Sequence, residues 1–267
     1  MNRATWILES DVFPDSHSPL RAAVADAGHR LLDWDDAWWA NGFPSDLAGP
    51  NTFFHGSLGN AARINDELDW TPGSFCSTSA FCCSSWYDAA REWLLHADWR
   101  LMPANEFVDT AADVAASLGC TDRIFVRPDS PLKPFSGRVL DVASVTLRAL
   151  DHGFYFDDES LPIVAAPIRN VGREWRFVIV GATVIAGSAY DAATRSAVPD
   201  QPASEAWTYA QSVAAAIPPP ASAYILDVCE CDGELRLIEF NPFGGADLYA
   251  CDAVAVVRAV TEIGSDG

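Results

Sequence analysis

The stretch of residues 224–243, near the carboxyl end, constrains the fold more than any other part of the chain. It reads YILDVCECDGELRLIEFNPF, which is two apolar runs joined by an Asp-Gly pair of the kind that turns β-hairpins. Three oxygen-bearing side chains, Asp227, Glu239 and Asn241, interrupt these runs. A polar group inside a buried strand is costly unless it has a partner, so we expect each of the three to be paired.

A metal ion is one partner that suits these side chains. Glu239 and Asn241 are two residues apart and therefore share one face of a strand. Together with Asp227 they form an oxygen-only ligand set, which suits Mg²⁺ that also contacts phosphate. A two-residue turn at Asp232-Gly233, however, would pair Asp227 with Ile238 and direct it to the wrong face. The metal hypothesis therefore requires a longer loop or a bulge, and the alternative is a polar strand end that caps a loop.

Composition and charge exclude several classes of protein. The 267 residues are 49% hydrophobic and 20% charged, values typical of globular domains with both helices and strands. The formal net charge of −20 repels nucleic acid and anionic membranes, so an anionic ligand requires a local cluster of cations. No apolar run reaches membrane-spanning length. Seven cysteines without a CxxC pair or a secretory leader favour reduced thiols in a cytoplasm.

Three cations precede the hairpin at places where an anion can bind. Arg127 ends an apolar run, Lys133 is the only lysine of the chain and lies in a Ser/Gly-containing loop, and Arg176 lies in a strand. Lysine binds phosphate as a compact charge. Each also has a structural explanation: a salt bridge of Arg127 with Asp122 or Asp129, a solvated Lys133, and a surface pair of Arg176 with Glu174.

The remaining pattern predicts an α/β segment followed by mixed structure. We expect strands at 5–8 and 30–34 with a helix between them that Ser18 caps and Gly28 ends. The corner 56–60 presents backbone N–H groups to an anion or forms a plain tight turn. Thr110 and Asp113 form a capping box that opens a short helix ending at Gly119. A second hairpin turns at Gly181.

Taken in order, Arg127, the loop DSPLKPFSG, Glu-Trp-Arg at 174–176, Asp227 and Glu-Phe-Asn-Pro-Phe at 239–243 resemble the ATP-grasp superfamily. The resemblance is to the clade in which an arginine replaces the usual first nucleotide lysine. It implies an α+β ATP-grasp fold over residues 81–267, in which two α+β subdomains clamp a nucleotide. A small α/β pre-ATP-grasp domain is expected over residues 1–80.

The resemblance also implies a role for each site residue, with ATP and Mg²⁺ as cofactors. Mg²⁺ would be held by Asp227, Glu239 and Asn241. The catalytic cations would be Arg176, which faces the γ-phosphate, with Lys133 and Arg127 on other phosphate oxygens. The rest of the nucleotide site would comprise backbone N–H groups of the phosphate loop, an adenine-binding segment, and an acid that orients Arg176: Ser136, Gly137, Val164, Ala165, Ala166, Pro167 and Glu174.

The activity implied is that of an ADP-forming carboxylate–amine ligase, which makes an amide bond through an acyl phosphate. Its partners would be a small-molecule carboxylate and an amine, or a peptide or protein, with no nucleic acid or membrane involved. Two alternatives stay open: a nucleotide-sensing or peptide-binding module without turnover, and a phosphotransferase on the same fold. The expected location is the cytoplasm, and the oligomeric state is open.

Overall fold

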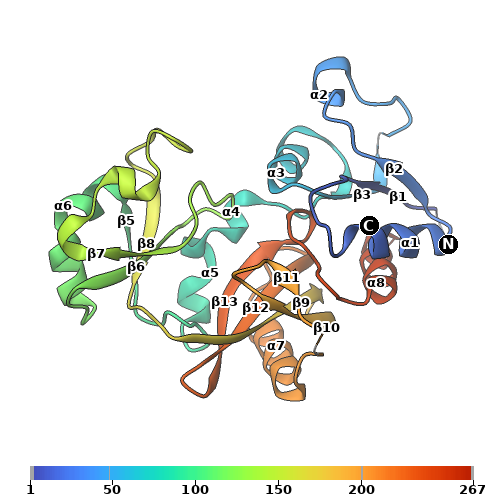
Figure 1. The fold of residues 1–267 in the computed structure, drawn as a ribbon. Coiled ribbons are helices and arrows are strands. Elements are labelled where there is room, and N and C mark those ends of the chain that lie inside the picture. The colour runs from blue at the N-terminus through green and yellow to red at the C-terminus, as the bar shows by residue number, and fades with distance from the viewer. Residues whose placement is uncertain (1–2, 48, 200, 266–267) are drawn as a thin grey trace. The chain divides into compact units, whose positions relative to one another are not determined.

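The computed structural model describes residues 3–47, 49–199 and 201–265, and the chain forms two compact units (Figure 1). Unit 1 comprises Met1–Ser77 and Gly172–Gly267, and unit 2 comprises Thr78–Val171. Both units contain helices and strands. Compactness thus groups the first part of the chain with the last, and the expected division after residue 80 into a small leading domain and a larger second one stays a prediction.

A four-stranded parallel sheet, in the order β2-β1-β3-β4, forms the first layer of unit 1. Apolar side chains from this sheet, including Trp6 and Phe53, are fully buried, and their rings stack at 5.0 Å between centroids. The strands and the helices that connect them are β1 (Thr5–Leu8), α1 (His17–Asp26), β2 (Arg30–Asp33), α2 (Trp38–Asn41), β3 (Pro50–His55), α3 (Leu58–Glu67) and β4 (Thr71–Gly73).

The second sheet of unit 1 has five strands in the order β11-β10-β9-β12-β13 and carries the sequence features discussed above. It consists of two long hairpins, one of β9 and β10 and one of β12 and β13. Its elements are β9 (Val171–Val180), β10 (Thr183–Asp191), β11 (Ser196–Ala197), α7 (Ser204–Ala216), β12 (Ala223–Cys231), β13 (Glu234–Pro242), η3 (Phe243–Gly245) and α8 (Ala253–Ser265). One cluster of buried apolar residues joins both sheets of unit 1 with α1 and α8.

Unit 2 has an antiparallel sheet in the order β5-β8-β6-β7. Helix α6 packs its apolar face on this sheet, and the residues of that core all lie within unit 2. The elements are α4 (Thr78–Phe81), α5 (Cys83–Ala90), β5 (Arg100–Pro103), α6 (Ala104–Ser117), β6 (Arg123–Pro128), β7 (Arg138–Asp141), η1 (Val142–Ser144), η2 (Leu147–Leu150) and β8 (Pro162–Ala166).

Two expected helix starts are wrong. Helix α1 begins at His17, before Ser18, and the hydroxyl of Ser16 forms a tertiary hydrogen bond instead of a cap. Helix α6 begins at Ala104, so Thr110 lies inside it and donates its hydroxyl to the Glu106 carbonyl. A threonine can satisfy its hydroxyl within a helix in this way, and the capping pattern at 110–113 was therefore misleading.

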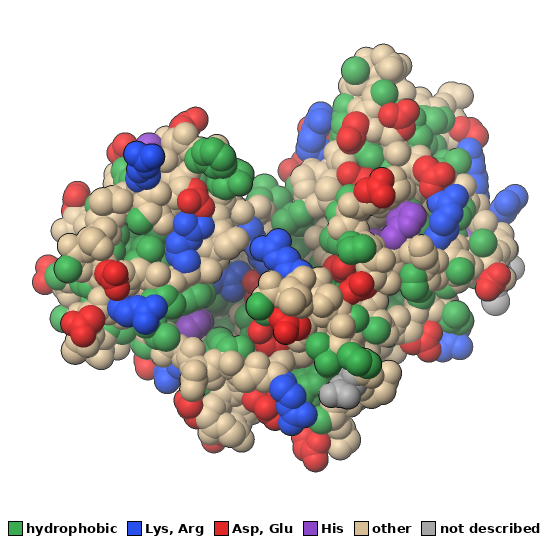
Figure 2. Space-filling model, in the orientation of Figure 1, with side chains coloured by type: hydrophobic (Ala, Val, Ile, Leu, Met, Phe, Trp, Pro, Cys, Tyr) green, Lys and Arg blue, Asp and Glu red, His purple; other side chains and the backbone are tan. Residues whose placement is uncertain are grey.

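Charged side chains are distributed over the surface. Figure 2 shows Asp and Glu side chains scattered over the visible face of both units, with Lys and Arg interspersed. Among the described residues no helix is both long and apolar enough to cross a bilayer.

Candidate functional site

A β-bulge in the β12–β13 hairpin decides whether the three polar side chains meet. The turn has two residues, Asp232 and Gly233, with φ of 52° and 84°, the conformation of a type I′ turn. Val228 pairs with Leu237, but the next pair is Asp227 with Glu239, because Ile238 is an extra residue. The bulge that the metal hypothesis requires is therefore present, and it places Asp227 directly opposite Glu239.

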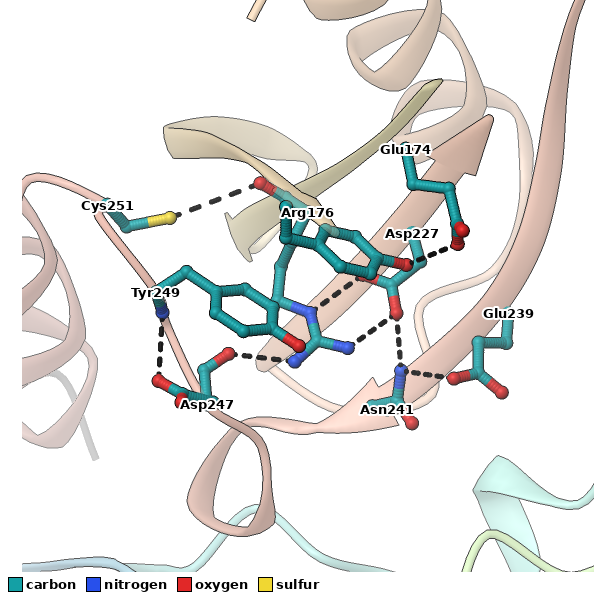
Figure 3. A network of polar contacts seen from close by, with 9 residues as sticks. Glu174, Arg176, Asp227, Glu239, Asn241, Asp247, Tyr249 and Cys251 are labelled. Atoms are coloured by element: carbon teal, nitrogen blue, oxygen red, sulfur yellow. Dashed lines mark hydrogen bonds and ion pairs between the residues drawn. The ribbon is translucent and has the colours of Figure 1, made fainter. Parts of the chain in front are cut away.

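Asn241 links the two carboxylates that the bulge aligns. Its amide Nδ2 donates to Asp227 Oδ2 at 3.0 Å and to Glu239 Oε1 at 3.1 Å (Figure 3). Asp227 is 1% exposed and Asn241 6%, whereas Glu239 is partly exposed. The assignment of the amide nitrogen and oxygen follows from this hydrogen-bond network. Two carboxylates and one amide thus converge within hydrogen-bonding distance.

Arg176, on β9, neutralises the buried carboxylate of Asp227. Its Nε and Nη2 donate to Oδ1 and Oδ2 at 2.8 and 2.7 Å, and its Nη1 donates to the Asp247 carbonyl at 2.8 Å. Burial alone would lower the pKa of Arg176, but the charge and hydrogen bonds of Asp227 outweigh burial and raise it. Arg176 therefore stays charged, and its fork fixes the Asp227 carboxylate in two directions.

Two stacked tyrosines cover the Arg176 guanidinium. The rings of Tyr190 and Tyr249 lie 4.9 Å apart and 9° from parallel, and Arg176 Cζ lies 5.3 and 4.9 Å from their centroids. The Tyr190 hydroxyl donates to Glu174 Oε2 at 2.8 Å. Glu174 therefore acts on Arg176 through Tyr190 rather than by a direct surface pair.

Tyr190 was not singled out from the sequence because a second bulge hides its position. A regular ladder from the turn at residues 181–182 would pair Tyr190 with Arg173. The register shifts between Val184 and Ala186, and Tyr190 instead pairs with Glu174. Burial, followed by the Asp227 and Glu239 charges, raises the pKa of Glu174, which the Tyr190 hydrogen bond opposes. The signal that would have found it is an aromatic hydroxyl on the strand that follows Glu-Trp-Arg.

The loop after β13 is fixed to the first loop of the chain. Ser16 Oγ donates to Asp247 Oδ1 at 2.6 Å, and that same oxygen accepts the Tyr249 backbone N–H at 2.9 Å. The Leu248 backbone N–H donates to Ser16 Oγ. Residues more than 230 positions apart in the sequence thereby hold Tyr249 against Arg176.

The glycine corner at 56–60 binds an anion from the chain itself. Glu9 Oε2 accepts the Ser57 backbone N–H at 2.7 Å and the Asn60 side-chain amide at 3.2 Å. A Cβ at residue 56 would collide with the Glu9 side chain, so glycine is required there. The negative charge at the N-terminus of α3 is favourable, and Glu9 supplies it.

In unit 2 the β6–β8 ladder brings Arg127 beside the expected adenine segment. Arg127, which is 9% exposed, pairs with Val164, and Val126 pairs with Ala165. Paired residues point to the same face of a sheet. Val164, Ala165 and Ala166 are buried, and Pro167 is partly exposed.

The loop between β6 and β7 presents Lys133, Ser136 and Gly137 to solvent, while Phe135 anchors it with 2% exposure. Lys133 has a φ of 50°, a left-handed conformation that lysine rarely adopts. A Cβ at residue 137 would lie 2.9 Å from the Phe125 ring. Glycine thus lets this loop approach the sheet closely.

Asp129 connects the same loop to helix α5. Its carboxylate accepts the Ser84 backbone N–H at 2.7 Å and the Ser84 hydroxyl at 2.9 Å, and its carbonyl accepts the Cys83 N–H. This is a capping interaction from a distant segment. The sequence offered Asp129 only as a partner for Arg127, and its capping role was missed because Ser84 is 45 residues away.

His96 is a further buried group near Arg127. Its ring stacks on Phe125 at 4.6 Å and 14°. Burial, with added repulsion from the charges of Arg127 and Arg169, lowers the pKa of His96 to about 4. The imidazole is therefore neutral at physiological pH.

The donor set in unit 1 fits a hard divalent cation. No group of three His, Cys, Asp or Glu side chains suited to a metal occurs among the described residues. The set has two carboxylates and an amide, however, and carboxylate and amide oxygens suit Mg²⁺ when phosphate and water complete the shell. The hydrogen bonds through Asn241 already hold the two carboxylates together against their repulsion.

The site residues expected from the sequence thus form two groups, one in each unit. Unit 1 brings together Glu174, Arg176, Asp227, Glu239 and Asn241. Unit 2 holds the second group on β6, the β6–β7 loop and the end of β8: Arg127, Lys133, Ser136, Gly137, Val164, Ala165, Ala166 and Pro167. Their roles toward ATP and Mg²⁺ stay proposals.

Comparison with known families decides the family of this chain. Residues 50–260 match a family described as an ATP-grasp domain, the third family of its clade. The chain belongs to this ATP-grasp family. The resemblance noted from the sequence is confirmed, and so is the ATP-grasp fold. No curated protein sequence matches the chain.

Solved ATP-grasp structures share the fold of this ATP-grasp chain at low sequence identity. D-cycloserine synthetase DcsG aligns with a TM-score of 0.69 and 13% identity, over 98% of this chain and 100% of that one. The ATP-grasp ligase PsnB, in complex with a phosphomimetic precursor variant, Mg and ADP, aligns with 0.56 and 12%, over 99% of both chains. D-alanine–D-alanine ligase from Bacillus anthracis aligns with 0.57 and 10%, over 99% of both.

Proposed function

We propose that this ATP-grasp protein is an ATP-dependent, ADP-forming carboxylate–amine ligase that acts through an acyl phosphate. The observation that carries the proposal is the bulge at Ile238, which aligns Asp227 with Glu239 and lets Asn241 bind both. A loop cap would not need two carboxylates held face to face by an amide. Membership in the ATP-grasp family and the ligases among its structural neighbours favour the same reaction class.

In this proposal Asp227, Glu239 and Asn241 hold Mg²⁺ with the nucleotide. The metal neutralises phosphate charge and polarises the γ-phosphate. Two of the ligands are charged, so the carboxylates and the ion leave little net charge beside the incoming phosphates. The role of Asn241 is to fix the separation of the two carboxylates, because it bonds both.

Arg176 stabilises the phosphoryl group in transfer. Its charge is permanent, and Asp227, the Asp247 carbonyl and the two tyrosine rings hold its position. A preorganised cation of this kind needs no reorganisation when charge develops in the transition state. We assign Arg127 and Lys133 to other phosphate oxygens, and the Ser136 and Gly137 N–H groups to the same phosphates.

The two chemical steps balance as follows. A carboxylate oxygen of the first substrate attacks the γ-phosphorus, the bond to the ADP oxygen breaks, and ADP leaves. The amine nitrogen of the second substrate then attacks the acyl carbon, the bond to phosphate breaks, and the amine loses a proton. Phosphorylation supplies the leaving group that a free carboxylate lacks, so the protein needs to align and neutralise anions and needs no covalent nucleophile.

Two alternative functions, binding without turnover and phosphotransfer, are separated from the ligase by one assay. Purified protein is incubated with ATP, with or without MgCl₂, and with a panel of amino acids and dipeptides as acids. Hydroxylamine serves as a general amine that traps acyl phosphates as hydroxamates. The ligase releases ADP and forms a hydroxamate only with Mg²⁺. A phosphotransferase would release ADP and give a stable phosphorylated product, and a sensing module would release none.

Asp227→Asn and Glu239→Gln test the metal assignment in the same assay. Each keeps the side-chain shape but removes a negative ligand, so ADP release should fall at least about a hundredfold, the scale of losing a positioned catalytic interaction. Binding of Mn²⁺, followed by electron paramagnetic resonance, should weaken in parallel. Asp232→Asn, at the solvent-exposed turn of the same hairpin, is the matched control. Near-normal ADP release by either site variant would contradict the assignment.

A further inference from the structure

The turn between β10 and β11 carries an arginine that the proposed reaction has not used. Asp191 accepts the Ala193 and Thr194 backbone N–H groups at 2.8 and 2.9 Å, and Arg195 follows with a φ of 53°. Tyr190, one residue before this turn, is the tyrosine that stacks on Tyr249. The turn is fixed from outside as well, because the Ala197 N–H donates to Asp15 Oδ2 at 2.7 Å. Arg195 therefore stands on a well-anchored turn beside the tyrosine pair.

Left-handed backbone at arginine and tyrosine is unusual. Asp and Asn tolerate it, and Gly adopts it freely, yet Arg195 and Tyr249 both have a φ near 50°. Apart from Asp and Asn, the described residues with left-handed φ that are not glycine are Phe75, Lys133, Arg195 and Tyr249. Backbone strain of this kind concentrates at functional sites. Glycine would suit the turn better at residue 195, so the arginine side chain is retained for another reason.

Arg195 and Tyr249 each offer a hydrogen-bond donor that the described part of the chain does not use. Arg195 is exposed and forms no hydrogen bond or ion pair with a described residue, and the Tyr249 hydroxyl donates to none, whereas the Tyr190 hydroxyl donates to Glu174. The two groups are close enough to interact electrostatically. Burial raises the pKa of Tyr249, while the positive charges of Arg176 and Arg195 oppose that rise.

The charge of the site gives these donors a purpose. Four carboxylates surround the single buried guanidinium of Arg176: Glu174, Asp227, Glu239 and Asp247. A carboxylate substrate that approaches the transferred phosphate is repelled by them. A second cation beside Tyr249 offsets this repulsion at the place where the acid must arrive.

We propose that Arg195 and the Tyr249 hydroxyl bind the carboxylate of the acid substrate. A guanidinium gives the bidentate geometry that carboxylates accept, and the phenol adds one donor beside it. The proposal rests on the proposed ligase function, because it identifies the substrate group recognised in the same site. It assigns these donors to the acid and not to ATP, whose phosphates also carry the oxygens that a guanidinium binds.

Thermal shift with the amino-acid panel tests the proposal without turnover. Sodium salts of the acids are added to wild type at constant ionic strength, and the apparent Kd is taken from the rise in Tm. For the acids that bind, Arg195→Gly should weaken binding about tenfold, Arg195→Lys less, and Tyr249→Phe about three- to tenfold. Binding of ATP, measured in the same way, should change less than about twofold.

Arg195→Gly has a second expected signature. Relief of the left-handed backbone should raise the Tm of the ligand-free protein by about 2 °C or more, so weaker acid binding cannot be ascribed to poor folding. Arg258→Gln, an exposed charge change on α8, controls for net charge and should leave acid binding unchanged.

Three results would overturn the proposal: no acid of the panel shifts wild type, the acids bind Arg195→Gly normally, or ATP binding weakens as much as acid binding. Failure of the ligase function looks different. An acid that binds through Arg195 but supports neither ADP release nor hydroxamate formation would leave the carboxylate site in place and contradict only the reaction.

Discussion

His96 shows how one buried side chain makes the stability of the chain depend on pH. Its ring is 8% exposed and stacks on Phe125, and its pKa is about 4 in the folded protein, against about 6.5 for an unfolded histidine. The unfolded chain therefore binds the proton more tightly. The contribution of His96 to stability is complete above pH 6.5 and is lost as the pH falls toward 4.

We expect His96→Phe to reduce the acid sensitivity of the protein. From pH 7 to pH 5 wild type should lose about 2 kcal/mol of unfolding free energy through this one group, and the phenylalanine variant should not, because it keeps a ring on Phe125 but cannot bind a proton. Urea denaturation at the two pH values measures the difference. His29→Phe, at a partly exposed histidine, is the control. Parallel loss in wild type and His96→Phe would refute the argument.

At the scale of elements, the two hairpins of the five-stranded sheet share one construction. Each gains a single extra residue in its second strand, Ile185 in β10 and Ile238 in β13. One bulge places Tyr190 opposite Glu174, and the other places Glu239 opposite Asp227. A bulge redirects side chains by one step of the ladder. The polar network around Arg176 thus depends on two local departures from regular pairing.

Exchanging the residues at the β13 bulge tests this construction. In the double variant Ile238→Glu with Glu239→Ile the composition and charge are unchanged, and both positions are only partly exposed. We expect Mn²⁺ binding and ADP release to be lost, because residue 239 is the one that faces Asp227. A regular ladder, in which residue 238 faces Asp227, predicts that both survive. The crystal or solution register of the variant is the control.

These bulges also mark the limit of what the sequence could predict. The hairpin at 224–243, its Asp-Gly turn and the family motifs were readable because they depend on local patterns. The register was not, since a bulge adds one residue without any distinctive sequence at Ile238 or Ile185. For the same reason Tyr190 and the capping by Asp129 were missed: both depend on contacts between segments that only the fold brings together. The position of Arg176 on a strand was readable, but its bidentate pairing with Asp227 was not.

At the scale of the whole molecule, each unit has hydrophobic clusters of its own. The cluster beneath α6 is drawn entirely from residues 102–165. Two other clusters contain only residues of unit 1, and one of them spans both of its sheets and both ends of the chain. Stability within one compact unit depends chiefly on its own buried apolar surface.

We therefore expect the fragment of residues 78–171 to fold alone. It contains all four strands of its sheet and the helix that covers them, so no strand loses its partner. Near-ultraviolet circular dichroism and a cooperative thermal transition would report a packed core. A fragment that starts at Ala104 and lacks β5 and α5 should be less stable and is the comparison. An unfolded 78–171 fragment would contradict the prediction.

The pair of Arg176 and Asp227 has a consequence for the energetics of the whole chain. Their side chains are 10% and 1% exposed, so folding strips water from two full charges. Replacing such a buried pair with apolar side chains of matching shape often leaves a protein equally stable or more stable by about 1–4 kcal/mol. Selection for a sturdy interior alone would therefore tend to erase the pair. Its presence indicates that the chain tolerates a less favourable interior in order to keep a fixed positive charge beside its carboxylates.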